Sequence, residues 1–506
     1  MARTDVAVAA PNEAAADAGR AVAEAGGNAV DTALAAALVT MVNEVGIVSL
    51  SSGGFVTVQP ADGAEPYTVD GWMDMPGRGL AVVSGDGSGS GPGGTWDIST
   101  AYGGGIDVTI GPGSVAVHGS VAAFEETHRR DGRLPWRELV APAIEVARGG
   151  FRLGSASRYY LGHVHESIFG WDPASHAALH SVDGSVTTGL VVVPDLVGSL
   201  ELIAAEGAAT LHTGELARLV AEDVVGRGGL LGAADLAAYE PVVRPALVTR
   251  VGPWTLATAP PPSLGGVCVA AMLRLLDDRP HGPWTPGDVD HLVRVQRAVL
   301  GHRLDVLDQT DDLVRDAAAF LDLVDRDHVG ALESGSTAHV SATDSEGTAC
   351  SVTVSSGYGA GMMAAGTGIW LNNCLGEQEL NPRGLHGLAP GTRLLSNMAP
   401  TVGRHADGSA LAIGSPGADR ITTAITQVLA GFVSGGLSLQ DAVDHPRVHL
   451  HRAGRPTEDL KVEDVDQPTM YFGGVGAALV RPDGSLDAAA DPRREGAVRL
   501  VRDADQ

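Results

Sequence analysis

Apolar positions in the first half of the chain recur mostly with the spacing of a helix. Over residues 12–42 the pattern predicts two helices, because Asn12 and Asn28 can each cap a helix start and Gly26-Gly27 interrupts the apolar run. Residues 53–72 alternate between apolar and polar positions, which predicts a β-hairpin. Further helices are expected within 121–151, in two pieces, and at 194–206, 214–225, 233–238 and 287–307.

The pattern changes after residue 336, where short alternating segments dominate. Before that point, residues 244–266 predict two short strands that end in a proline turn, and residues 84–94 predict a surface loop rich in glycine and serine. Helices that come mostly first, followed by strands that share a sheet with earlier ones, indicate a layered α/β (α+β) fold with mixed or antiparallel sheets. The later strands are expected at 337–343, 348–355, 367–371, 398–403 and 410–414, and the later helices at 418–434 and 438–444.

The composition narrows the classes of protein and of partner. Hydrophobic residues make up 44% of the 506 positions and charged residues 19%, which is typical of a globular chain of one large or two medium domains. Aromatic residues make up only 4% and there are 68 glycines, so we expect close backbone packing rather than a bulky aromatic core. The 34 basic and 61 acidic residues give a net charge of −27, which argues against nucleic acid or an anionic membrane as a partner.

Little in the chain suggests export, membrane insertion or a cofactor. Cys268, Cys350 and Cys374 form neither a disulfide framework nor a spacing typical of zinc ligands. The first residues lack a signal-peptide pattern, and the apolar run from Leu34 to Val42 is too short to span a bilayer. We therefore expect a cytoplasmic protein with no metal and no organic cofactor.

The tripeptide Gly335-Ser336-Thr337 places a hydroxyl at the start of a predicted strand, behind two small residues. If the peptide bond before Thr337 were cut, this residue would carry a free α-amine, with a pKa of about 7.7–8.0, beside its hydroxyl. The amine can take the hydroxyl proton while the oxygen attacks a carbonyl, so one residue supplies both base and nucleophile. The same hydroxyl can first attack the carbonyl of Ser336, and water then opens the resulting ester. Ser-Thr pairs are common at strand starts, so this tripeptide alone does not distinguish a nucleophile from an ordinary strand residue. The rest of the chain must decide between the two.

The stretch TAHVSATDSEGTACSVTVS, residues 337–355, resembles the nucleophile region of the γ-glutamyltransferases (γ-glutamyltranspeptidases), which are N-terminal-nucleophile hydrolases. The usual start of this region in the family is T-T-H-x-S-x-x-D-x-x-G-N-A-V. Other blocks are similar in the same order, so the resemblance covers most of the chain. These blocks are residues 10–38, 111–151, 228–244, 259–266, 366–373, 394–401 and 414–429.

The resemblance implies an αββα sandwich that is made as a zymogen and matures by self-cleavage between Ser336 and Thr337. The products would be a large subunit segment, 1–336, and a small one, 337–506, which together form one domain. By position, Thr337 matches the nucleophile and Ser355 matches a threonine whose hydroxyl supports it.

Three further positions match residues around the reacting carbonyl of the substrate. Ser396 matches the first serine of the family motif L-S-S-M. Gly417 and Ala418 match paired glycines whose backbone N–H groups form the oxyanion hole, and an alanine keeps that N–H group. The resemblance therefore implies that the catalytic residues are retained.

Departures from the family pattern lie on the substrate side. Trp72 stands where the family has an arginine that grips the α-carboxylate of glutamate, and an indole cannot replace that bidentate clamp. The family's Q-x-x-D, which holds the amine and carboxylate end of the substrate, is here replaced by the run from Cys374 to Glu377. Asn397 replaces the second serine of L-S-S-M, and Gly357 replaces a substrate-facing asparagine. We therefore expect rebuilt recognition of the acyl end and, within a family of glutathione metabolism, a main substrate other than glutathione.

Several of these residues also have a structural interpretation. His339 shares the face of Thr337 and is either a base or a satisfied structural histidine, and the second interpretation is favoured. Cys374 has no basic neighbours in the sequence, which favours an unreactive buried thiol. Trp72 is either pocket wall or core, and Arg393 either pairs near the pocket or is exposed in a loop.

The leading hypothesis is a hydrolase or acyltransferase that forms an acyl-enzyme on Thr337. It would take the acyl group from a γ-glutamyl or other amide substrate and pass it to water or an amine. One alternative is a biosynthetic family member that cleaves a C–C bond next to a carbonyl, and another is an unprocessed binding protein without activity. The expected partners are the small-molecule substrate and the other processed subunit, and a homo-oligomer stays open because the sequence indicates no interface.

Overall fold

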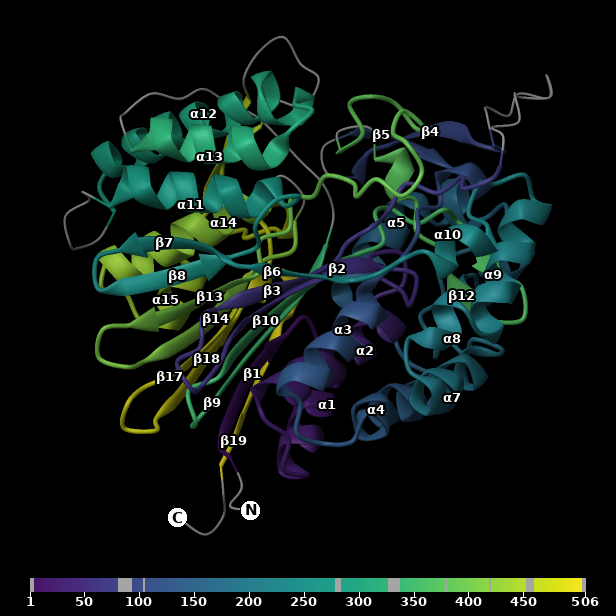
Figure 1. Ribbon diagram of the computed structural model, residues 1–506, viewed down its shortest axis with the longest axis horizontal. Coiled ribbons are helices and arrows are strands. Elements are labelled where there is room, and N and C mark those ends of the chain that lie inside the picture. Colours follow the sequence, from purple (N-terminus) through teal and green to yellow (C-terminus); the bar gives the residue numbers. More distant parts are fainter. Residues whose placement is uncertain are drawn as a thin grey trace.

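Two antiparallel sheets lie face to face at the centre of the computed structural model, with helices on both outer sides (Figure 1). This arrangement is an αββα sandwich, so the predicted fold class is confirmed. The structure describes residues 4–80, 93–102, 105–277, 284–325, 337–377, 380–417, 420–451 and 459–502.

The first sheet contains the strand that directly follows Thr337. The strands β9 (Ala338–Asp344) and β10 (Ala349–Ser355) form a hairpin at its centre and pair outward with β1 (Val6–Ala10) and β2 (Gly53–Gln59). Strands from before and after residue 336 are therefore interleaved in one sheet. The full order is β19-β1-β9-β10-β2-β3-β6, where β3 spans Tyr67–Gly71, β6 spans Val242–Pro245 and β19 spans Ala497–Val501.

The second sheet has the order β18-β17-β14-β13-β8-β7, and each strand runs antiparallel to its neighbours. It also combines early and late segments of the chain, because β7 and β8 come before residue 336 and the other four come after it. The bounds are β7 Leu247–Val251, β8 Trp254–Thr258, β13 Thr401–His405, β14 Ala410–Gly414, β17 Gly476–Val480 and β18 Leu486–Ala490.

Small side chains allow the two sheets to approach closely. Ala7 and Ala349 of the first sheet form a buried cluster with Ala412 and Ala478 of the second. Ser351 adds a polar bridge, since its hydroxyl donates to the Ile413 carbonyl at 2.9 Å and accepts from the Thr401 N–H at 3.1 Å. The low aromatic content of the chain thus corresponds to an interface of alanine and serine.

Helices cover the outer face of each sheet. On the side of the first sheet, α2 contacts β9 and β10 and α3 contacts β2, whereas α11 and α14 contact strands of the second sheet (Figure 1). The helices before residue 240 are α1 Glu13–Glu24, α2 Ala29–Asn43, α3 Ser120–Asp131, α4 Trp136–Gly149, α5 Ser155–Phe169, α6 Pro173–Leu179, α7 Leu196–Glu206, α8 Ala209–His212, α9 Glu215–Gly226 and α10 Ala233–Ala237. The later ones are α11 Leu264–Leu276, α12 Pro286–Asp305, α13 Leu313–Val324, α14 Arg420–Leu429 and α15 Leu439–Asp444.

Three two-stranded ribbons complete the described strands. They are β4 (Trp96–Thr100) with β5 (Ile106–Ile110), β11 (Met363–Ala364) with β12 (Ile369–Trp370), and β15 (Val448–His451) with β16 (Asp459–Val462). No helix in the described part of the chain combines the length and the apolar character needed to cross a bilayer.

The predicted helix caps are confirmed. The side chain of Asn12 accepts a hydrogen bond from the Ala15 N–H, and Asn28 forms a reciprocal capping box with Asp31. All residues of α2 are buried, because it lies between the first sheet and α4. A helix that is apolar on every side is the expected outcome at such a position.

Several predicted elements need correction. Residues 244–266 contain parts of three strands, β6, β7 and β8, instead of two, because the chain passes from the first sheet to the second at Ala246. The strand expected at 367–371 shortens to Ile369–Trp370, and the helix expected at 418–434 is regular only to Leu429, after which its turns widen. The sequence did not reveal α5, α6, α13, β1, β4, β5, β17, β18 or β19, and the loop expected at 84–94 lies almost entirely outside the described residues.

Candidate active site

Thr337 lies at the first position before β9, in the middle of the first sheet. The pairing of Ala338 with Val354, continued by one residue, sets Ser355 opposite Thr337, and both residues are only 2% exposed. The hydroxyl of Ser355 accepts a hydrogen bond from the Gly357 N–H at 3.0 Å. The structure thus places the two predicted residues opposite each other at one end of two central strands. Ser336 lies outside the described residues.

The loop predicted to form the oxyanion hole begins where β14 ends. Gly414, the last residue of β14, packs so closely against the imidazole of His339 that a side chain would overlap with the ring. Gly417 has a φ of +124°, and a Cβ atom there would lie 2.8 Å from the Cα of Gly473. Both features require glycine at position 417. Ala418 lies outside the described residues, so its role stays a prediction.

A buried network of charged residues holds the segment that packs against this loop. Arg493 forms ion pairs with Glu463 at 2.6 Å and with Asp491 at 3.0 Å, and Arg447 pairs with Asp491 at 2.7 Å. Arg447 also donates to the carbonyl of Phe472, next to Gly473. All four charged side chains are at most 2% exposed. Burial would raise the pKa of Asp491, but the two arginines lower it overall.

Trp72 forms a packed wall near Thr337 rather than an open binding group. Its ring stacks on Phe55 at a centroid distance of 6.3 Å and leaves no room for a side chain at Gly53, the residue of β2 that pairs with Ser355. The indole N–H donates to the Leu395 carbonyl at 2.8 Å. The one polar hydrogen of the indole is therefore used inside the protein. This hydrogen bond holds the segment before Ser396 against Trp72.

Ser396 and Asn397 follow this contact and are 1% and 3% exposed. The Ser396 hydroxyl accepts a hydrogen bond from the Met398 N–H at 3.2 Å. The backbone carbonyl of Ser396 accepts from the N–H of Leu264, at the start of α11. The Asn397 amide is different, because neither its oxygen nor its nitrogen has a hydrogen-bond partner among the residues that the structure describes. A buried amide without partners is costly, so this side chain is a candidate for contact with a substrate or an ordered water.

An asparagine at position 357, as the resemblance would suggest, would be crowded by the side chains of Asn373 and Glu377. The φ of Gly357 is +65°, and a Cβ atom would lie 2.5 Å from Oδ1 of Asn373 and 3.0 Å from Oε1 of Glu377. That Asn373 oxygen also accepts from the Tyr358 N–H at 2.6 Å. The departure at 357 is thus coupled to the polar residues that surround it.

Cys374 lies beside Glu377 in the same buried cluster, and both residues are 1% exposed. Burial, together with the adjacent carboxylate and its hydrogen bond, raises the pKa of the Cys374 thiol well above its usual value. The thiol therefore stays protonated and unreactive, as the sequence favoured.

A network around Arg393 was not anticipated in this form. Its guanidinium pairs with Asp70 at 3.1 Å and with Asp74 at 2.7 Å, and lies over the ring of Tyr239 at 4.9 Å. Arg393 and the Tyr239 hydroxyl both donate to the Trp72 carbonyl. Arg393 is thus a brace behind the Trp72 wall, and the sequence signal for it was the acidic pair that flanks Gly71-Trp72-Met73.

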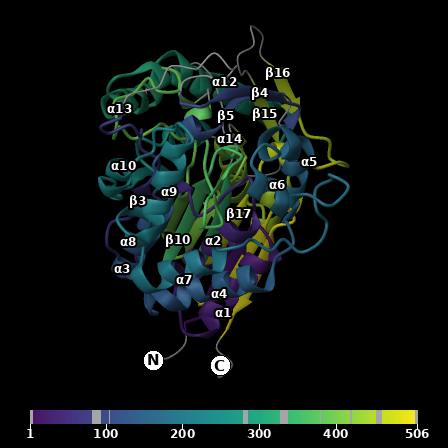
Figure 2. The same ribbon diagram turned by 90° about the vertical axis from the view of Figure 1, so that its right-hand side faces the viewer.

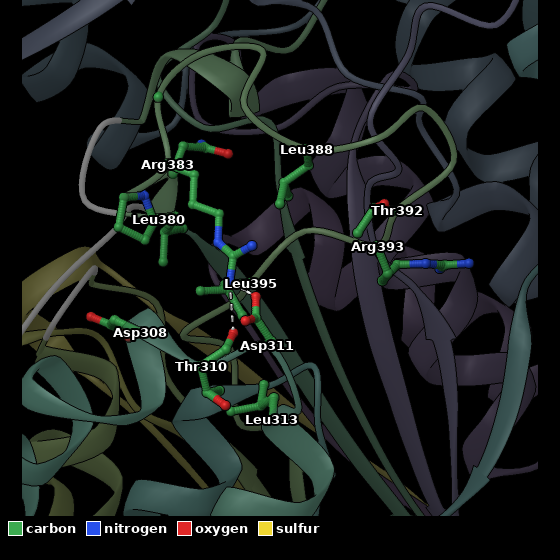
Figure 3. Close-up of a pocket in the computed structure, with 13 residues that line it drawn as sticks. Asp308, Thr310, Asp311, Leu313, Leu380, Arg383, Leu388, Thr392, Arg393 and Leu395 are labelled. Atoms are coloured by element: carbon green, nitrogen blue, oxygen red, sulfur yellow. Dashed lines mark hydrogen bonds and ion pairs between the residues drawn. The ribbon is translucent and has the colours of Figure 1, made fainter.

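A pocket of about 190 Å³ borders this region (Figure 3). Leu388 and Leu395 line it, while the side chain of Arg393 extends away from it. Arg383 closes one side by contacting Asp311 and the Thr310 carbonyl. The pocket therefore lies next to the Trp72–Leu395 contact and is mainly apolar there.

His339 is a structural residue of the sheet interface. Its Nδ1 lies 2.9 Å from the Thr353 hydroxyl and its Nε2 lies 2.7 Å from the Ser341 hydroxyl, so both ring nitrogens are occupied. Burial lowers the pKa of His339 to about 3, which keeps the ring neutral. The structural interpretation of this histidine therefore fits better than that of a base.

Buried histidines predict a specific pH dependence of stability. Burial lowers the pKa of His339 and of His118 to about 3 and that of His212 to about 4. Unfolded histidines bind protons at about pH 6.5, so stability should fall as the pH drops from 6.5 towards 4, by up to about 1.4 kcal/mol per pH unit for each histidine. Urea unfolding at about pH 7, 6 and 5 measures this slope. We expect His339→Gln to reduce the slope, and equal slopes for variant and wild type would contradict the assignment.

Gly357→Ala should destabilise the fold by about 2–3 kcal/mol, because left-handed backbone strain adds to a steric overlap. Gly366→Ala is a matched control, since Gly366 has a similar φ of +73° but no atom within 4 Å of the added Cβ. It should cost only the strain, about 1 kcal/mol. Urea unfolding of both variants checks the difference, and equal losses would mean that the space around Gly357 is less restricted than described.

Comparisons with known proteins relate this chain to one family and one fold. The sequence model of the Gamma-glutamyltranspeptidase family matches residues 15–501. The chain is 28% identical to the "Acylase ACY 1 proenzyme" of Pseudomonas sp. (strain V22), over 95% of this chain and 90% of the relative. It is also 28% identical to the "Glutathione hydrolase proenzyme" of Pseudomonas aeruginosa, over 98% of this chain and 94% of the relative. A solved structure of cephalosporin acylase from Bacillus halodurans shares the fold, with a TM-score of 0.76 at 20% identity over 99% of this chain and 96% of that one.

Proposed function

Because the chain belongs to the γ-glutamyltranspeptidase family, whose members are hydrolases and transferases, we propose that it is an N-terminal-threonine enzyme that cleaves itself between Ser336 and Thr337. The observation that carries this proposal is the position of Thr337, which lies opposite Ser355. Two residues further on, His339 packs against the end of β14, where the loop that contains Gly417 begins. Thr337, Ser355 and the start of the Gly417 loop thus belong to three neighbouring strands, β9, β10 and β14, which supports their proposed roles in one site.

The proposed chemistry needs only groups of this chain and water. In maturation, the Thr337 hydroxyl attacks the Ser336 carbonyl, the amide C–N bond breaks in favour of an ester, and water hydrolyses the ester to a Ser336 carboxylate and a free Thr337 amine. In turnover, that amine takes the hydroxyl proton while the oxygen attacks the substrate carbonyl. The proton then passes to the leaving amine, and water or an amine releases the acyl group from Thr337.

The acyl site supports a substrate without the α-carboxylate of glutamate. Trp72 is uncharged, and its N–H donates to the Leu395 carbonyl. The guanidinium of Arg393 is already paired with Asp70 and Asp74. Neither side chain therefore offers a free bidentate cation of the kind that a carboxylate prefers. The Asn397 amide, which has no partner among the described residues, offers an NH₂ donor group and a carbonyl acceptor instead. Glu377 keeps a carboxylate in the same cluster, near Gly357. An amide with an uncharged or amine-bearing acyl chain suits these groups best.

Four p-nitroanilides that share the same first four carbons of the acyl chain test this proposal: γ-glutamyl, 4-aminobutyryl, glutaryl and butyryl. The second lacks the α-carboxylate, the third lacks the amine and the fourth lacks both, so the set separates the two charges of the substrate. We expect the two anilides without carboxylate to exceed the γ-glutamyl compound in kcat/KM by about tenfold or more. Removing the carboxylate should therefore raise kcat/KM whether or not the amine is present.

A γ-glutamyl preference of tenfold or more over 4-aminobutyryl would overturn the proposed acyl specificity while leaving the nucleophile in place. If none of the four anilides is cleaved by protein that has been processed at Thr337, the proposed class of substrate is wrong.

A further inference from the structure

A cluster of histidines lies outside the candidate active site, where α5 and α6 run side by side (Figure 2). His165 belongs to α5, His176 belongs to α6, and His180 follows the end of α6. Nδ1 of His165 lies 2.9 Å from Nε2 of His180, and Glu166 Oε2 lies 3.9 Å from that Nε2. One ligand atom from each of His165, Glu166 and His180 falls within 4.8 Å of the other two.

The proton on His180 is fixed by its surroundings. Its Nδ1 lies 3.0 Å from the His176 carbonyl, which can only accept, so Nδ1 carries the hydrogen and Nε2 carries the lone pair. The ring is also held in place, because it stacks on the His176 ring at 4.1 Å and its side chain is only 1% exposed. A histidine that donates one N–H to a backbone carbonyl and points its other nitrogen at a shared point is the usual arrangement of a metal ligand.

The distance between the two nitrogens also fits a metal ion. With metal–nitrogen bonds of about 2.0–2.1 Å, two nitrogens 2.9 Å apart subtend an angle of about 90°, as in octahedral or square sites. A tetrahedral ion would need a separation of about 3.3 Å, which a small rotation of His165 provides. The Glu166 carboxylate is 78% exposed, so it can turn towards the ion and leaves a path for its entry.

We propose that His165, His180 and Glu166 bind one divalent transition-metal ion of the kind that prefers imidazole, such as Zn²⁺ or Ni²⁺, with water in the remaining positions. The ion would link α5 to the residue after α6 and so brace the turn at Gly170–Asp172 between them. That turn is tied to the rest of the protein, since Asp172 pairs with Arg227 at 2.7 Å and accepts from the Met363 N–H at 3.3 Å. The site is thus structural and independent of the proposed reaction.

Zinc titration of untagged protein, stripped of metal with a chelator, tests the site. Isothermal titration calorimetry with ZnCl₂ should show one saturable equivalent, and a hundredfold excess of zinc over Kd should raise Tm by about 2–3 °C. His165→Gln and His180→Gln should each weaken zinc binding by about tenfold or more, because each variant removes one of the two imidazole ligands. The Tm of each variant without zinc shows whether it remains folded.

His163→Gln is the matched control on the same helix. His163 is exposed and its Nδ1 already contacts the Tyr159 carbonyl at 2.8 Å, so this variant should bind zinc like the wild type. The proposal is overturned if the wild type takes up no stoichiometric zinc, or if His163→Gln weakens binding as much as His165→Gln does. A loss confined to folded His165→Gln supports it even where His180→Gln is unstable.

Discussion

Thr337→Ala should leave the protein as one uncut chain and lower amide hydrolysis by about 10³-fold or more. Alanine has neither the hydroxyl that attacks the Ser336 carbonyl nor the one that later carries the acyl group. Thr337 is 2% exposed and precedes β9, so removing its hydroxyl deletes few contacts and should not unfold the sheet. Intact-mass spectrometry of wild type and variant measures the cleavage, and release of p-nitroaniline measures turnover.

Thr337→Ser is the control for this experiment, because serine keeps a hydroxyl at the same position. It should still be cut, more slowly than the wild type, and keep measurable turnover. If the wild type remains a single chain under native conditions, Thr337 has no free amine and the proposed mechanism fails. Cleavage of Thr337→Ala at the same bond would show instead that another group, or a contaminating protease, cuts the chain.

Arg493→Met should lower the free energy of unfolding by about 3–5 kcal/mol, the cost of leaving buried charges without their partner. Glu463 would lose its bidentate partner and Asp491 one of its two, at side chains that are 1% exposed. Arg481→Met is the matched control, since Arg481 and its partner Asp487 are 43% and 34% exposed, and the loss there should be at most about 1 kcal/mol. Urea unfolding of the two variants gives the comparison.

Acid should weaken the same network in the wild type. The pKa of Asp491 is lower in the folded protein than in the unfolded chain. Its contribution to the free energy of unfolding is therefore complete above the unfolded value of about 3.9 and is lost as the pH falls through the folded value.

Because the network holds Phe472 beside Gly473, which packs against Gly417, an Arg493→Met variant that is destabilised but folded should also lose turnover. Equal stability losses in Arg493→Met and Arg481→Met would contradict the assignment of a buried network.

The parts of the fold that the sequence revealed are those with strong local signals. Asn12 and Asn28 sit at helix starts whose capping depends on a few adjacent residues, and both are found as expected. The strands β17 and β18 are rich in alanine and glycine, so they lack the alternation that marks a half-buried strand, and they become strands only because the other sheet covers them. Their pairing is a property of the whole sandwich.

The sequence could propose residues for the site but not the contacts that those residues make. A motif could place Thr337, Ser355 and Gly417, since these depend on position along the chain. No pattern could show that the Trp72 indole donates to Leu395, because the two residues are joined only by the fold. The same holds for the contact between His165 and His180, because one lies in α5 and the other follows α6, two helices that were not anticipated.

The interleaved strands of the first sheet have a consequence for how such a protein can be encoded. β9 lies between β1 and β10, and β10 in turn pairs with β2, so a break before Thr337 leaves each product holding strands whose neighbours belong to the other. Two separate genes for residues 1–336 and 337–506 would therefore each yield a half with exposed strand edges, prone to aggregate until it met its counterpart. A single open reading frame guarantees equal amounts of both halves and delivers them already paired.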